Sequence, residues 1–180
     1  MKKNGLILIL MLALTLVLAG LSAFAESGVG GDVLTWSLEE GVLTITGKGA
    51  MTNWSYDSTP TWELRKPDIT AVVVEEGVTT IGSFAFRDCR NLAAVTLPDG
   101  IETIGDYAFY QCDKLVGIDL PEGLQQIGAY AFSHAGLRTA KIPDSVTYIG
   151  NDAFEYLDGL GSIELPAGIT EIPNWAFFCC

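Results

Sequence analysis

Cysteine is the residue type in this chain whose placement most directly suggests a chemical role. Cys89 and Cys112 lie 23 residues apart, and each follows a phenylalanine by three residues. Other phenylalanines are followed at the same distance by Ala135, Leu157 and Cys180, so the position accepts small or apolar side chains. Buried free thiols are therefore the favoured interpretation. A Cys89–Cys112 disulfide remains open, because an exported protein would permit it.

The remaining reactive residues do not form a catalytic or metal-binding pattern. The chain has no Cys-x-x-Cys pair and a single histidine, His134, whereas structural zinc sites combine several such ligands. His134 lies in an irregular segment, where we expect it to face solvent. The adjacent carboxylates Glu75 and Glu76 adjoin a turn and are typical of a solvated surface. Without a serine-nucleophile, phosphate-loop or zinc motif, the sequence predicts a protein that is not an enzyme and needs no cofactor or metal.

A second recurring position could bind a ligand through aromatic side chains. The residue before each of five Ala-Phe pairs is aromatic in four cases, and the exception is Asp152. Tyrosine and tryptophan are enriched at protein interfaces. The candidate ligand-binding residues are therefore Phe84, Tyr107, Tyr130 and Trp175. In the alternative interpretation these rings stack on one another and shield the surface, which would be a structural role.

An internal repeat of about 23 residues sets all of these positions. Repeats begin at Ile81, Ile104, Ile127 and Ile149, and a further one begins at Ile172. The third repeat is one residue shorter than the others, in the segment between its Ala-Phe pair and Leu137. One repeat cannot bury its apolar side chains alone, whereas repeats stacked at the strand spacing of about 4.8 Å can.

Each repeat predicts one short strand and one large buried ring. The segments around Val95, Ile118 and Ile163 alternate inward and outward positions, as strands do. A proline ends each strand because it cannot donate a ladder hydrogen bond. The outward positions, such as Gly117 and Asp119, are small or mixed in charge and predict an undistinguished sheet face. The predicted repeat core consists of Phe86, Phe109, Phe132, Phe154 and Phe177.

The repeated string Ile-Gly-x-x-Ala-Phe, followed by Cys or a small residue, Leu, Ile-x-Leu-Pro and Gly-Ile-x-x-Ile, resembles the BspA-like leucine-rich repeat family. This is the 23-residue class of bacterial surface proteins, and the likeness extends from about Ile69 to Cys180. The resemblance implies a β-rich solenoid and a secreted or surface-exposed role in adhesion. Some members bind host extracellular-matrix proteins. It implies no particular ligand and no catalytic residues.

Residues 26–68 predict a β-hairpin cap and an irregular connection to the repeats. Two alternating segments, 33–38 and 42–46, flank a Glu-Glu-Gly turn, which is a hairpin signal. A solenoid needs its terminal apolar face covered. Trp36, Trp54 and Trp62 could plug the first repeat, and the alternative is a sugar-binding aromatic cluster.

Residues 1–25 have the features of a signal peptide. Lys2 and Lys3 precede an apolar run, and Ala23-Phe24-Ala25 gives a cleavage site after Ala25. The run is shorter than the roughly 20 residues that cross a bilayer, so we expect no membrane span after cleavage. Loss of the two lysines would leave eight basic and 22 acidic residues, a formal charge near −14. Such a charge disfavours nucleic acid as a partner.

These features predict a secreted or cell-surface module that binds an extracellular or host matrix protein. The alternative is a carbohydrate-binding or scaffold segment of a larger exported protein. Residues 69–180 would hold about four full repeats and a truncated one, since the last stops at Cys180 soon after its Ala-Phe pair. We expect that open edge to permit self-association.

Overall fold

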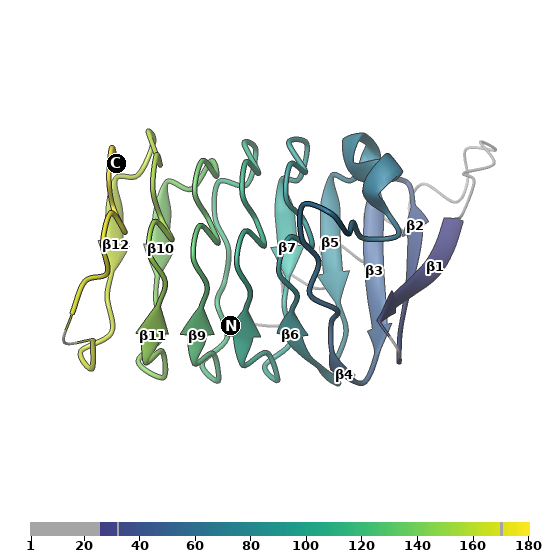
Figure 1. The fold of residues 1–180 in the computed structure, drawn as a ribbon, viewed down its shortest axis with the longest axis horizontal. Coiled ribbons are helices and arrows are strands. Elements are labelled where there is room, and N and C mark those ends of the chain that lie inside the picture. The colour runs from purple at the N-terminus through teal and green to yellow at the C-terminus, as the bar shows by residue number, and fades with distance from the viewer. Residues whose placement is uncertain (1–25, 32, 170) are drawn as a thin grey trace, which may run out of the picture.

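The repeats lie side by side in one row, with the N-terminal strands at one end and residue 180 at the other (Figure 1). The computed structural model describes residues 26–31, 33–169 and 171–180. The predicted signal peptide lies outside these residues. Within them, no helix is both long and apolar enough to cross a membrane.

The N-terminal strands form an antiparallel unit. Strand β1 (Glu26–Gly31) pairs with β2 (Leu34–Glu39), which pairs with β3 (Val42–Gly47). Glu40 and Gly41, both with positive φ, make the two-residue turn between β2 and β3. The alternating pattern of β2 places Trp36 in the core with its two apolar neighbours on the same face.

The repeats extend this unit by parallel pairing on one side. Strand β3 pairs with β5 (Ala71–Val74), and β5 pairs with β7 (Ala94–Thr96). The register aligns Leu43 with Val72 and Val72 with Val95. A short 3-10 helix, η1 (Glu63–Asp68), connects the N-terminal strands to the repeats.

A second parallel sheet runs along another side of the row and was not predicted. It joins β4 (Gly49–Ala50), β6 (Val78–Ile81), β8 (Thr103–Ile104), β9 (Gln126–Ile127) and β11 (Tyr148–Ile149). Its register stacks the isoleucines that begin successive repeats into one buried column. Most of these strands have only two residues, which is too short for the alternation that identifies a strand in a sequence.

The first sheet is interrupted in the second repeat, where the predicted strand around Ile118 is wrong. Strand β10 (Thr139–Lys141) pairs only with β12 (Ser162–Glu164). A Cβ atom at Gly117 would meet nothing within 4 Å. Glycine weakens a strand because it loses more backbone conformational freedom on folding than other residues do. A bond from Arg138 N–H to the Val116 carbonyl, 3.1 Å long, still links the two repeats at this place.

A column of stacked rings fills the core of the repeat stack. Phe86, Phe109, Phe132 and Phe154 are fully buried, and successive ring centroids lie 5.3, 5.4 and 5.4 Å apart. The ring of Phe177 continues the stack at 5.6 Å but is half-buried. At the other end the column continues into the N-terminal part of the chain through Trp62, whose ring stacks on Phe86 at 5.9 Å.

The three tryptophans that were predicted to plug the first repeat lie at this N-terminal end of the column. Trp62 is fully buried, its indole N–H donates to the Ala85 carbonyl at 2.9 Å, and Trp36 and Trp54 meet its ring edge-on. All three rings lie in the core. A sugar-binding site needs an exposed ring face, so that alternative is wrong for these residues.

We predict that Phe109→Ala lowers the free energy of unfolding by about 3–5 kcal/mol, because it opens a cavity in the middle of the ring column. The substitution Phe177→Ala, at the equivalent position, should lower it clearly less, because that ring is half-buried. Urea denaturation of both variants measures the difference. Equal losses would contradict the placement of the column.

Candidate binding surface

The third side of the row consists of turns in which side chains sit on left-handed backbone. In the first repeat Phe84 and Asp88 have φ of 61° and 62°, and in the second Tyr107 and Gln111 have φ of 56° and 55°. The later repeats place Tyr130, His134, Asp152, Tyr156, Trp175 and Cys179 in the same region. Left-handed backbone costs a non-glycine residue about 1–2 kcal/mol. The neighbouring repeats must therefore hold these turns in place.

Hydrogen bonds between repeats hold the turns. The N–H groups of Phe84, Phe86 and Asp88 donate to carbonyls of the second repeat at 2.8–2.9 Å, and the later repeats continue this pattern. Side chains reinforce it: Ser83 Oγ accepts from the Asp106 N–H at 3.2 Å, and Asp106 Oδ1 accepts from the Ala129 N–H at 2.7 Å. Each turn is thus fixed by the next repeat along the row.

The structure brings together three of the four predicted ligand-binding residues. The rings of Phe84 and Tyr107 stack at 4.8 Å, and those of Tyr107 and Tyr130 stack at 4.7 Å. All three are half-buried, so these rings cover part of the repeat stack and also expose part of their own surface to solvent. Trp175 stands apart, because Asp152 occupies the position between it and Tyr130, and it is 62% exposed.

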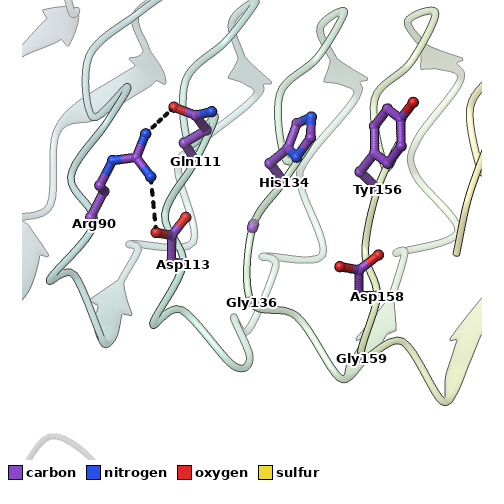
Figure 2. Close-up of a pocket in the computed structure, with 9 residues that line it drawn as sticks. Arg90, Gln111, Asp113, His134, Gly136, Tyr156, Asp158 and Gly159 are labelled. Atoms are coloured by element: carbon purple, nitrogen blue, oxygen red, sulfur yellow. Dashed lines mark hydrogen bonds and ion pairs between the residues drawn. The ribbon is translucent and has the colours of Figure 1, made fainter.

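A second row of rings runs beside the first and was missed in the sequence. It consists of Tyr110, His134, Tyr156 and Phe178. The rings of His134 and Tyr156 lie nearly parallel, 4.6 Å apart (Figure 2). His134, which we expected to face solvent, is half-buried, because its ring packs within this row. Its members come from two different positions of the repeat, so neither position is regularly aromatic along the sequence.

Tyr56 and Arg87 close the N-terminal end of both rows. The Tyr56 ring meets Phe84 edge-on at 5.0 Å, and the guanidinium of Arg87 lies 4.5 Å from the Tyr56 ring centroid. Arg87 also pairs with Asp88 at 3.3 Å. We call the two rows, together with Tyr56 and with Trp175, whose ring meets Phe178 edge-on at 4.7 Å, the ring wall. Its members are Tyr56, Phe84, Tyr107, Tyr110, Tyr130, His134, Tyr156, Trp175 and Phe178.

A hollow of about 350 Å³ opens beside the second row of rings (Figure 2). Arg90, Gln111, Asp113, His134, Tyr156 and Asp158 line it, together with Ala135, Gly136 and Gly159. The hollow coincides with the shortened third repeat. That repeat has only Gly136 where its neighbours have two residues, Asp113-Lys114 and Asp158-Gly159.

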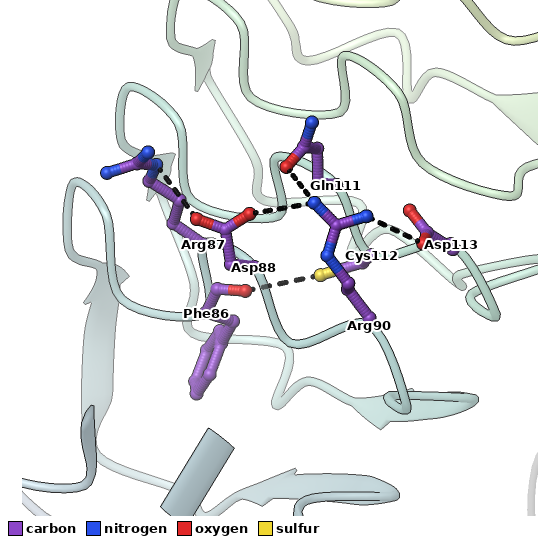
Figure 3. Close-up of polar contacts among 7 residues, drawn as sticks. All are labelled: Phe86, Arg87, Asp88, Arg90, Gln111, Cys112 and Asp113. Carbon is purple, nitrogen blue, oxygen red and sulfur yellow. Dashed lines mark hydrogen bonds and ion pairs between the residues drawn. The ribbon is translucent and has the colours of Figure 1, made fainter. Parts of the chain in front are cut away.

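The two internal cysteines are buried free thiols. Burial raises the pKa of Cys89 to about 12 and holds the pKa of Cys112 well above its usual range. The Cys112 thiol donates to the Phe86 carbonyl, with sulfur and oxygen 3.2 Å apart (Figure 3). A neutral, enclosed thiol is a poor nucleophile, since the thiolate is the reactive form.

Residues 64–180 match the family model described as a BspA type leucine rich repeat region, in six copies. The chain belongs to the BspA-type leucine-rich repeat family. The resemblance drawn from the repeat motif is therefore confirmed. Among curated proteins, none is significantly similar to the chain.

Solved bacterial leucine-rich repeat proteins share the fold of this BspA-type chain. A leucine-rich repeat protein from Eubacterium ventriosum is 26% identical, with a TM-score of 0.64 over 81% of this chain and 45% of its own. One from Bacteroides ovatus is 26% identical, with a TM-score of 0.64 over 83% and 44%. The Leucine Rich Repeat protein of T. pallidum is 34% identical, with a TM-score of 0.59 over 81% and 70%. The chain spans less than half the length of the first two.

We predict that a thiol reagent at mildly alkaline pH labels Cys179 first in the folded chain, because that residue is exposed. Cys180 should follow more slowly, because partial burial raises its pKa. Cys89 and Cys112 should be labelled only after unfolding. Mass spectrometry of the labelled peptides reads the order, and early labelling of either buried residue would contradict the structure.

We also predict that two tyrosines of the ring wall differ in how their pKa responds to a nearby substitution. Hydrogen bonding to the Asp152 carboxylate, followed by burial, raises the pKa of Tyr130, because its phenolate would lose the bond and be repelled. Asp152→Asn should therefore lower the pKa of Tyr130. Tyr107, whose pKa is raised first by burial, should change little. NMR of labelled tyrosine as pH is raised measures both, and an unchanged Tyr130 would contradict this contact.

Proposed function

We propose that this BspA-type chain is a protein-binding module that is secreted or displayed on the cell surface, and that it binds through the ring wall. The observation that carries the proposal is the pair of adjacent aromatic rows on one side of the repeat stack. Interfaces are enriched in such residues, and tyrosine and tryptophan dominate their binding energy. An extracellular or host matrix protein is the partner class we propose.

The fixed positions of the rings support this role. Stacking and the inter-repeat hydrogen bonds hold Tyr107 and Tyr130 in place before any partner arrives. These side chains would then lose little conformational entropy when a partner binds, and such loss is a main cost of association. Exposed rings lie near both ends of the wall, with Tyr56 64% and Trp175 62% exposed.

We also infer that the stack is a solenoid and that the N-terminal strands cap it. The buried Trp62 in line with the phenylalanine column supports this reading, since it covers the ring that the first repeat would otherwise expose. Placement outside the cell rests on the signal-peptide pattern of residues 1–25 and on the family's bacterial surface members.

The test measures binding of the chain to a panel of immobilised extracellular-matrix proteins, beside a glycan array. The double variant Tyr56→Ser/Trp175→Ser should weaken protein binding about tenfold or more, because each substitution removes an exposed ring from the wall. Both side chains are largely exposed, so the melting temperature should change little.

Tyr148→Ser is the matched control. Tyr148 is 54% exposed but lies in β11, on the second sheet, so its loss should leave binding unchanged. Equal binding by the double variant and the control would contradict the ring wall as the binding face. Binding to glycans but to no protein would favour the carbohydrate-binding alternative.

A further inference from the structure

The hollow in the shortened third repeat has an internal counterpart that indicates what it could bind. In the first repeat the guanidinium of Arg90 reaches across to the second repeat (Figure 3). It donates to Asp113 Oδ2 at 3.2 Å and to Gln111 Oε1, and it lies 3.5 Å from Asp88 Oδ1. One repeat thus offers a carboxylate, and the preceding repeat supplies the cation.

The fourth repeat offers the same kind of carboxylate without a cation to meet it. Asp158 follows Phe154 by four residues, as Asp113 follows Phe109, and Tyr156 corresponds to Gln111. Asp158 is exposed and forms no ion pair within the described part of the chain. Arg138, the arginine of the third repeat, has its Cγ atom 3.8 Å from a Cβ built at Gly159 and forms no ion pair with Asp158.

The third repeat cannot supply the missing side chain. Its Gly136 stands where an arginine equivalent to Arg90 would be, and a Cβ atom there would lie 2.2 Å from the Asp113 carbonyl oxygen. The backbone therefore leaves a space between Asp113 and Asp158, below the His134 and Tyr156 rings (Figure 2).

We propose that this hollow binds an arginine side chain of the protein partner, whose guanidinium meets Asp158 as Arg90 meets Asp113 two repeats earlier in the row. Charge and shape both favour this occupant. The lining has two carboxylates against one arginine, and a planar guanidinium matches carboxylate geometry better than an ammonium does. The described residues hold no cluster of three or more metal-ligating side chains, so an organic cation fits the hollow better than a metal ion.

This inference rests on the proposed function, because the arginine belongs to a bound protein. The site lies beside the ring wall and shares His134 and Tyr156 with it. An arginine in the hollow would fix the register of a partner that also covers the rings. Alone, such an exposed pair binds weakly, so the isolated side chain should bind in the millimolar range.

The test titrates the full chain with N-acetyl-arginine methylamide and, separately, with its citrulline analogue, which has the same shape without the charge. His134 is the only histidine of the chain, so its imidazole NMR signals report on the hollow without further assignment. The arginine compound should shift these signals to saturation, and the citrulline compound should not.

Asp158→Asn should weaken the arginine response about fivefold or more, because it removes the unpaired charge. Asp119→Asn is the matched control, since Asp119 is exposed on the strand side of the row and should leave the response unchanged. Both variants should melt as the parent does. Equal responses to arginine and citrulline, or equal responses of the two variants, would overturn the proposal.

The two proposals can fail separately. If the chain binds a matrix protein through the ring wall and arginine does not reach the hollow, only this inference is wrong. If arginine binds with the expected specificity and no protein partner is found, the selectivity of the hollow for arginine stands, but the proposed function and the assignment of that arginine to a protein partner are both wrong.

Discussion

Stacking of the core phenylalanines between repeats is the interaction on which the rest of the structure depends. The ring of Phe109 is fully buried, and Phe86 and Phe132 of the neighbouring repeats cover its two faces. Burial therefore belongs to the row and not to any single repeat. Rings can stack this way only when equivalent atoms lie about one strand spacing apart, and that spacing brings the backbones into hydrogen-bonding register. The sheets and the ring wall follow from the same register.

The register also explains how bulky side chains occupy left-handed turns. Tyr107 would be strained at φ of 56° in an isolated peptide. In the stack, its N–H donates to the Ala129 carbonyl and its ring lies between two neighbours. Packing against neighbours therefore offsets a local cost, and the outcome is an aromatic face with little freedom to move. Structural and binding roles of these rings are not exclusive, because a half-buried ring can serve both.

Positions where one repeat differs from the others give the repeat stack its individual features. Asp152 interrupts the first aromatic row and separates Trp175 from the stack. The first sheet is interrupted in the second repeat, around Gly117. The missing residue of the third repeat opens the hollow beside His134. A regular stack presents the same chemistry at every step, so a partner can recognise one particular place only where the sequence breaks the pattern.

The sequence by itself determined the family, the repeat boundaries and the ring column, because each recurs at a fixed spacing along the chain. The Ala-Phe pair marks the buried ring of every repeat, and Gly136 marks the shortened one. Outside that column, tertiary structure alone decided which side chains meet across repeats. The second row of rings draws on two positions of the repeat, and the two-residue strands of the second sheet are too short for a pattern. The hollow depends on the close approach of Gly136 to the Asp113 backbone, and no spacing in a linear sequence contains that distance.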